Sequence, residues 1–130
     1  MTLNRMSALW ARTALVWFVL AVCLGLFMGI TQRFEFAPSH AHIGVLGWLS
    51  SGVFAFLYAV AREGRPGRGP FFHWAAYNIG VAAMTGGLFG GLGLGREAMM
   101  AVVPAGAILI VLSVLWATVT LWPRLRPGAD

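Results

Sequence analysis

The chain has 130 residues, of which 59% are hydrophobic and 10% are charged, and its mean hydropathy is +0.80. Soluble domains are about 45–50% apolar and about 25% charged, so this composition excludes an ordinary water-soluble domain. It also excludes a disordered chain, which needs low hydrophobicity and high net charge. We therefore expect one transmembrane domain over residues 1–130, because the length allows no more than a single domain.

The charge balance is strongly basic, with a net charge of +5, nine arginines and no lysine. The arginines fall between apolar segments rather than in one patch, which favours a role in membrane topology over nucleic-acid binding. The single cysteine, Cys23, lies inside an apolar run. It has no partner for a disulfide within the chain, and we interpret it as a small buried hydrophobic residue.

Four apolar segments follow one another, each long enough for a transmembrane helix. They cover about residues 10–30, 41–61, 71–94 and 98–122, and Pro123 stops the last one. The short connections predict an all-α, up-down-up-down four-helix bundle. The first segment follows two arginines, as in a signal peptide, but it is long for that role and no clean small-residue cleavage site follows it. We interpret it as a retained helix.

The arginines also indicate orientation. Seven lie on one predicted side (Arg5, Arg12, Arg62, Arg65, Arg68, Arg124 and Arg126) and two on the other (Arg33 and Arg96). Because positive charge gathers in the cytoplasm, we expect both termini there, in a bacterial inner membrane. The basic segment 62–70 suits anionic lipid headgroups. Several tryptophans lie near the predicted helix ends, as an aromatic belt would have, among Trp10, Trp48, Trp74, Trp116 and Trp122.

Carboxylates are scarce and lie outside the predicted helices, with Glu35, Glu63 and Glu97 in loops and Asp130 at the end. A pump or proton-coupled transporter normally needs an acid inside a span, so this distribution disfavours both classes. The sequence also carries no signature of a Ser-His-Asp site, a phosphate-binding loop or a cysteine metal knuckle.

Glycine is frequent, with 17 residues. Three pairs have G-x-x-x-G spacing, namely Gly25 with Gly29, Gly86 with Gly90, and Gly87 with Gly91. Such spacing lets helices approach closely, either within the bundle or across a homodimer. It equally leaves room for a flat ligand between helices.

Two histidines, His40 and His42, begin the second predicted helix just after Pro38. On a helix, side chains two positions apart point about 200° apart, so the pair would serve two sites rather than grip one ion. In an extended segment they would share a face and could chelate one copper or zinc ion. Gly44 and Gly47 favour the helical alternative, because they leave a strip without side chains where a planar macrocycle could lie.

A third histidine, His73, begins the third predicted helix with Tyr77 one turn later on the same face. The second helix is about 28 Å long, which places His73 at the opposite membrane surface from His42. We expect His73 to anchor the helix at the interface. It remains only a weaker candidate metal ligand.

The segment His40 to Trp48 (H-A-H-I-G-V-L-G-W) resembles a helix near the end of the catalytic subunit of haem–copper oxidases, particularly the C-family. It is also similar to a nitric-oxide-response membrane family and to small four-helix membrane proteins. Two further runs, 54–58 (F-A-F-L-Y) and 73–80 (H-W through N-I-G), extend the resemblance over about residues 38–85.

The resemblance implies that His40 matches the ligand of the high-spin haem and His42 the ligand of the low-spin haem. This chain lacks the remaining haem ligand and the copper-binding histidines of the oxidase, and it has Tyr77 where related small proteins often repeat a histidine. A complete oxygen-reducing centre in one chain is therefore excluded.

Together these patterns predict a membrane-embedded b-type haem protein for electron transfer or for binding nitric oxide or oxygen. His40 and His42 are the expected iron ligands, with Gly44 and Gly47 beside the haem. A second axial ligand from another protomer predicts a homodimer or higher oligomer. Two alternatives stay open: a cofactor-free subunit or assembly factor of a respiratory complex, and a copper-binding protein. Whether the chain is an enzyme is left open.

Overall fold

A computed structural model describes residues 4–61 and 67–125, and within these residues the chain is helical and has no strand. The α-helices are α1 (Arg5–Thr31), α2 (Ala37–His42), α3 (Ser50–Val60), α4 (Gly69–Leu88) and α5 (Val102–Leu121). Between and after them lie the 3₁₀ segments η1 (Phe34–Phe36), η4 (Glu97–Ala101) and η5 (Trp122–Arg124), and the π-helical segments η2 (Ile43–Leu49) and η3 (Phe89–Gly93). The predicted all-α class is confirmed.

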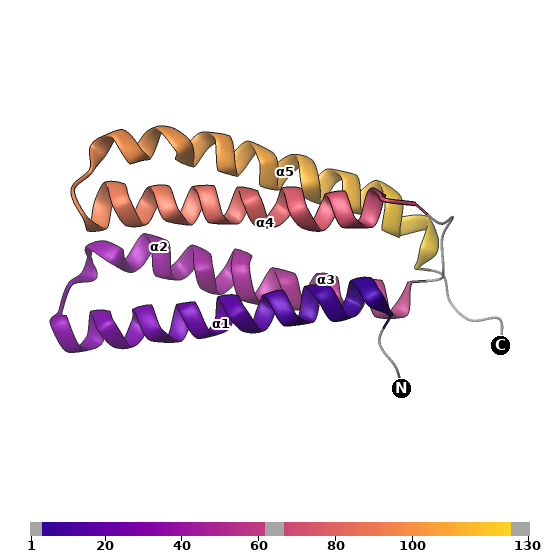
Figure 1. Cartoon of the computed structure of the whole chain (residues 1–130), viewed down its shortest axis with the longest axis horizontal. Coiled ribbons are helices and arrows are strands. Elements are labelled where there is room, and N and C mark those ends of the chain that lie inside the picture. Colours follow the sequence, from indigo (N-terminus) through magenta and orange to yellow (C-terminus); the bar gives the residue numbers. More distant parts are fainter. Residues whose placement is uncertain (1–3, 62–66, 126–130) are drawn as a thin grey trace.

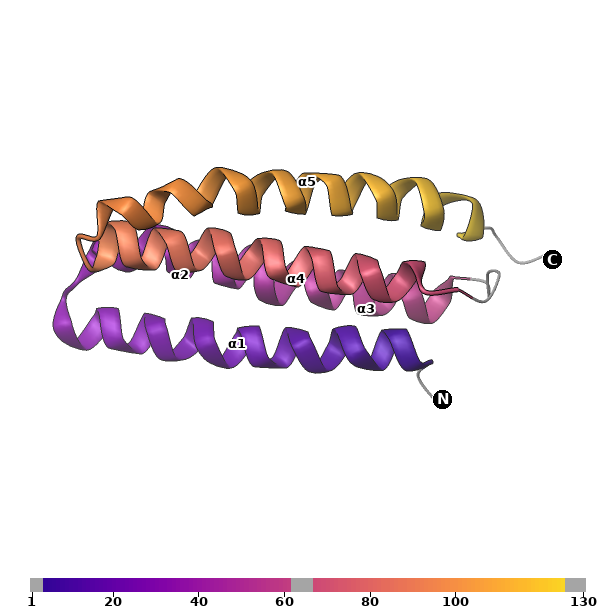
Figure 2. The same ribbon diagram turned by 45° about the horizontal axis from the view of Figure 1, so that its top comes forward.

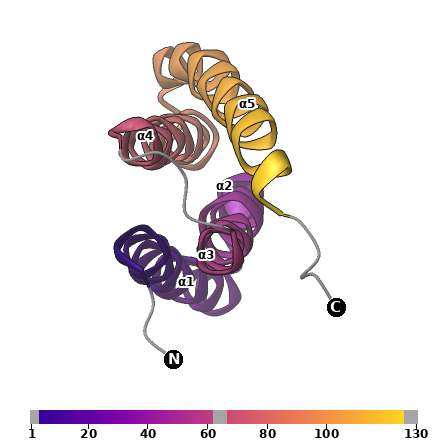
Figure 3. The ribbon, with the colours of Figure 1, turned by 90° about the vertical axis from the view of Figure 1, so that its right-hand side faces the viewer.

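These segments join into four rods. The second rod is continuous through α2, η2 and α3, while η3 extends α4 and the segments η4 and η5 flank α5. Figure 1 shows α1 beside the second rod and α4 beside α5, and Figure 2 shows the same pairing after rotation. Viewed end-on in Figure 3, the two pairs form a bundle in which α2 and α3 lie between α1 and α5. The four rods match the four predicted segments to within a few residues.

The rod ends follow from local sequence. At the start of α1, the side chain of Asn4 accepts a hydrogen bond from the backbone N–H of Ser7 over 2.8 Å, which satisfies one of the free N–H groups of the first turn. At its other end, Gln32 adopts a left-handed conformation (φ 56°), which turns the chain out of the helix. Pro38 and Pro70 stand in the first turns of α2 and α4, where a missing N–H costs nothing.

Three rods are long and apolar enough to cross a membrane, namely Arg5–Thr31, Phe34–Val60 and Glu97–Arg124. This indicates a membrane protein. The helix α4, whose sequence includes polar Asn78 and Thr85 among several glycines, is not one of these three. The predicted span over about residues 71–94, which α4 and η3 cover, therefore stays a prediction. Three of the seven arginines used for orientation (Arg62, Arg65 and Arg126) lie outside the described residues, as does most of the basic segment 62–70.

The outer faces of the rods are apolar, as expected beside lipid. On α5, for example, Ile108, Leu112 and Val119 are 61%, 58% and 75% exposed. Cys23 is also exposed, so the prediction that it is buried was wrong. Because lipid and core are equally apolar, an apolar run does not reveal which of its residues face inward.

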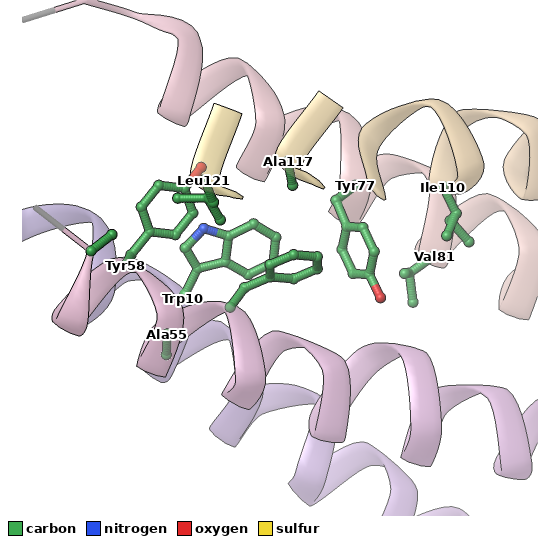
Figure 4. Packing of buried hydrophobic residues seen from close by; sticks show 10 residues of the cluster. Trp10, Ala55, Tyr58, Tyr77, Val81, Ile110, Ala117 and Leu121 are labelled. Carbon is green, nitrogen blue, oxygen red and sulfur yellow. The ribbon is translucent and has the colours of Figure 1, made fainter. Parts of the chain in front are cut away.

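The core is centred on Trp10, which is fully buried. Its ring lies 4.9 Å from that of Phe54 and 5.4 Å from that of Tyr77, measured between ring centroids. Figure 4 shows this packing, with Tyr58 and Leu121 at one end of the cluster and Val81 and Ile110 at the other. Trp10 is thus a core residue, and any aromatic belt must be formed by other tryptophans. Trp122, 78% exposed, has the exposure that a belt residue requires.

Polar side chains tie the two helix pairs together. Trp17 of α1 donates its ring N–H to the side-chain oxygen of Asn78 on α4 over 2.8 Å, and Trp74 of α4 donates to the hydroxyl of Thr13 on α1 over 3.0 Å. Between α2 and α4, the hydroxyl of Ser39 donates to the backbone carbonyl of Thr85 over 2.9 Å. Such bonds supply directional contacts where lipid provides no hydrophobic drive for helix association.

Several glycines permit close contact between α4 and the fourth rod. A Cβ added at Gly87 would lie 2.7 Å from Cγ2 of Val103, and one added at Gly80 would lie 2.9 Å from the carbonyl oxygen of Gly106. In contrast, a Cβ at Gly29 or Gly86 would meet no atom within 4 Å among the described residues. The G-x-x-x-G pairs therefore divide into members that pack inside the chain and members that face open space.

Candidate functional site

His40 faces α1. Its Nδ1 lies 3.1 Å from the backbone carbonyl oxygen of Ala21. A carbonyl can only accept a hydrogen bond, so this contact places the proton on Nδ1 and the free electron pair on Nε2. The ring rests against Gly25, where an added Cβ would lie 2.9 Å from Cε1 of His40. Gly25 is therefore the residue that makes room for this imidazole on α1.

His42 has the same chemical arrangement but a different neighbour. Its Nδ1 lies 2.7 Å from the carbonyl oxygen of Pro38, one turn earlier in the same helix, so Nε2 again carries the free electron pair. The side chain lines a groove of about 320 Å³ together with Val45, Leu46 and Met84. Met84 comes from α4, so this groove runs between the second rod and α4.

The side chains of the two histidines thus contact different parts of the molecule. Both belong to α2, and one contacts α1 while the other lines the groove next to α4. This is the helical alternative predicted for the H-x-H motif, in which side chains two positions apart diverge. The extended form, needed for both rings to chelate one ion, does not occur in the structure.

The predicted strip of glycines beside the histidines is open at one position and filled at the other. A Cβ at Gly44 would meet nothing within 4 Å in the described part of the chain. At Gly47, an added Cβ would lie 2.7 Å from Cγ of Trp17, so the indole of α1 already occupies the space. Sequence reasoning did not foresee this partner, because α1 and η2 are far apart in the chain.

The backbone directly after the histidines is π-helical over Ile43–Leu49. Such wider turns are rare and occur frequently at functional sites. The hydroxyl of buried Tyr77 donates to the backbone carbonyl of Leu46 in this segment over 3.0 Å, and Ser50 donates to the carbonyl of Val45 over 2.9 Å. These side chains stabilise a segment that the sequence did not reveal, since its composition is that of an ordinary apolar helix.

His73 is buried inside the bundle, so the prediction that its side chain anchors the helix at the interface was wrong. It is 4% exposed, and its ring lies among those of Trp10, Phe54 and Trp116 at centroid distances of 5.0, 4.8 and 5.4 Å. Its Nδ1 is 3.0 Å from the hydroxyl of Tyr58 on α3. The aromatic residues at the starts of α1 and α4 and the end of α3 form one cluster there, and the ring of His73 is part of it.

The described residues contain no group of three or more histidine, cysteine or acidic side chains placed to hold a metal ion. Any metal bound through His40 or His42 therefore needs ligands of another kind, such as a macrocycle, a thioether or a residue of another chain.

No protein-family model matches the chain, and comparisons with curated proteins and with solved structures find no significant match.

Proposed function

We propose that this chain is a membrane-embedded b-type haem protein with His40 and His42 as iron ligands. The observation that supports this most is that each Nδ1 lies within hydrogen-bonding distance of a carbonyl oxygen, which leaves each Nε2 free. Metal-binding histidines usually donate their other ring N–H in this way, because the bond fixes the tautomer and orients the ring. An apolar helix supplies the dry surroundings that a haem protein uses to tune its iron.

The space around the two rings favours His42 as the better-fitting ligand. Its groove has apolar walls of Val45 and Leu46 and is open beside the imidazole. His40 instead packs on Gly25. A macrocycle on that side needs the open flank at Gly44, since the flank at Gly47 holds Trp17. When bound, haem would supply an iron for electron transfer or for nitric oxide or oxygen binding, and these side chains would hold it and exclude water.

A further ligand to the haem iron could come from two sources. The resemblance and the divergent histidines favour a histidine from another protomer, and hence a homodimer or higher oligomer. The groove adds an in-chain source, because Met84 lines it together with His42. Imidazole and thioether are both known ligands of haem iron, so these two side chains would together hold the group.

The proposal includes the orientation. The rods cross a bacterial inner membrane up-down-up-down, with both termini in the cytoplasm, as the excess of arginine on one side indicates. His40 and His42 then lie toward the outer leaflet. The setting is respiratory, on the strength of the oxidase-like segment from His40 to Trp48.

The first test is the absorption spectrum of the detergent-purified protein, oxidised and then reduced with dithionite. We expect a sharp Soret band and the reduced α and β bands of b-type haem. His42→Ala should remove most of the haem, whereas Val53→Ala, which changes an exposed residue on the same rod and outside the groove, should retain it. Full haem occupancy in both His40→Ala and His42→Ala would refute the ligand assignment.

The response of the reduced spectrum to carbon monoxide then distinguishes electron transfer from gas binding. A six-coordinate iron leaves no position for the gas, so an unchanged reduced spectrum favours electron transfer and a shifted spectrum favours gas binding. If Met84 is the sixth ligand, Met84→Leu should convert an unresponsive spectrum into a responsive one. If the ligand comes from another protomer, this variant should behave like the wild type.

A cofactor-free subunit or assembly factor remains the second candidate, favoured by the open small-residue positions at Gly29, Gly52 and Gly86. Such positions suit docking of another transmembrane helix. A featureless visible spectrum after expression with ample haem, together with co-purification of a larger respiratory complex, would favour this function. The third candidate function is that of a copper-binding membrane protein, and metal analysis that finds copper without haem would favour it.

A further inference from the structure

A second groove lies between α4 and α5, apart from His40 and His42. It has a volume of about 320 Å³, and its walls include Phe72, His73, Leu112, Ser113 and Trp116. Phe72 and Leu112 are 61% and 58% exposed on the apolar outside of the bundle. The groove is therefore open toward lipid. None of its lining residues is charged, which excludes a charged headgroup as the preferred occupant.

The polar group of most interest in this groove is the imidazole of His73. Although the residue is only 4% exposed, its Nε2 has no hydrogen-bond partner among the described residues. Buried polar atoms are nearly always paired, because leaving one unpaired costs the hydration it had in water. His73 lines the groove, and its unpaired nitrogen is the feature that a bound ligand would explain.

The hydrogen-bond partner of His73 Nδ1 determines whether the ligand at Nε2 must be a hydrogen-bond donor or an acceptor. Nδ1 lies 3.0 Å from the hydroxyl of Tyr58. A phenol is the more acidic hydrogen-bond donor and an imidazole nitrogen the better acceptor, so we assign Tyr58 as the donor. Nε2 of the neutral ring then carries the proton. The ligand must therefore present an acceptor, such as a carbonyl oxygen.

The residues that line the groove further restrict the chemical class of the ligand. The ring of Trp116 lies 5.4 Å from that of His73 and packs closely on Gly69, where an added Cβ would be 2.9 Å from its Cζ2. Flat aromatic walls favour a flat ring as ligand. An apolar exit between exposed Phe72 and Leu112 favours a ligand that arrives through the membrane.

We propose that this groove binds the head of a membrane-soluble quinone. A quinone carbonyl oxygen accepts a hydrogen bond from Nε2–H of His73, the quinone ring lies against Trp116, and the tail leaves past Phe72 and Leu112 into lipid. The proposal concerns binding alone. It does not depend on haem, because none of the groove residues belongs to the site at His40 and His42.

The experiment titrates menadione, a quinone head without a tail, into nanodiscs that contain the full chain, with empty nanodiscs as the blank. Saturable quenching of tryptophan fluorescence above the blank is the expected result. His73→Phe keeps an aromatic ring and removes the donor, and should weaken binding about tenfold. It can also disturb the core through Tyr58, so a second variant is needed.

Leu112→Trp provides that variant, because it fills the groove from the lipid side and leaves His73 in place. Leu115→Trp is its matched control, since Leu115 is equally exposed, at 57% against 58%, but lies outside the groove. We expect Leu112→Trp to abolish saturable binding and Leu115→Trp to preserve it. Quenching that never saturates, or equal affinity in Leu112→Trp and Leu115→Trp, would overturn the proposal and leave lipid as the occupant.

Discussion

The hydroxyl of Tyr77 on α4 donates to the backbone carbonyl of Leu46 over 3.0 Å, inside the π-helical segment η2. Tyr77 is 1% exposed, so water does not compete for this bond. Here the side chain has a structural partner, which links the helix after the two histidines to the opposite helix pair.

Tyr77→Phe keeps the ring in the core and removes only this hydrogen bond. We expect a loss of about 0.5–1.5 kcal/mol in the free energy of unfolding, because side-chain hydrogen bonds in membrane proteins contribute on that scale. Reversible unfolding in mixed micelles measures the difference. An unchanged free energy would mean that the Leu46 carbonyl is satisfied equally well without Tyr77.

Gly25→Ala should displace His40. The added Cβ would lie 2.9 Å from Cε1 of the imidazole, so the ring must move away from α1. We expect destabilisation of about 1–3 kcal/mol, typical of overpacking, together with a changed Soret band if haem is bound. Gly29→Ala is the matched control on the same helix, because its Cβ would meet nothing within 4 Å of described structure. It should be neutral or slightly stabilising. Equal effects of the two substitutions would contradict the packing of His40 on Gly25.

Gly87→Ala and Gly86→Ala test whether the glycines of α4 pack inside one chain. At Gly87 the new Cβ would lie 2.7 Å from Val103, so we expect a loss of about 1–3 kcal/mol. At Gly86 it would meet no described atom, and the better helix propensity of alanine should add up to about 1 kcal/mol. Thermal unfolding of both variants provides the comparison. A destabilising Gly86→Ala would show that a second chain or partner covers that face.

Gly44→Leu tests the open flank near the histidines. Its Cβ would have free space, so we expect the fold and unfolding temperature to change little. If a macrocycle uses this space, haem content should fall several-fold, since a side chain of this size competes directly for the volume. Haem per protein, measured by pyridine haemochrome, is the readout. Full haem content with Gly44→Leu would remove Gly44 from the site.

Much of the fold could be predicted from the sequence, because apolar length and breakers such as Pro38 and Pro123 determine where helices begin and end. The faces of the helices that point into the core could not be predicted in this way. A soluble helix reveals its core side by alternation with polar residues, whereas a helix in lipid is apolar all round. For this reason Cys23 was predicted in the core although it lies on the outside, and no sequence pattern identified Trp10 as the centre of the core.

In the candidate site, too, the features set by local sequence were predicted and the contacts between rods were not. The divergence of His40 and His42 follows from helical geometry alone and was predicted. The carbonyl of Ala21 and the ring of Trp17 come from another rod, so no local pattern announces them. His73 looked interfacial because it begins a helix. Its burial depends on aromatic residues from three other rods, which only the assembled bundle brings together.

The π-helical turns of η2 separate the histidines from the part of the second rod that packs in the core. A regular helix turns about 100° for each residue, so removing one residue between Ile43 and Leu49 would rotate His40 and His42 by that angle relative to α3. The contacts of Phe54 and Tyr58 would stay in place. A single inserted or deleted codon in this stretch thus offers evolution a way to aim a metal ligand at a different neighbour without rebuilding the core.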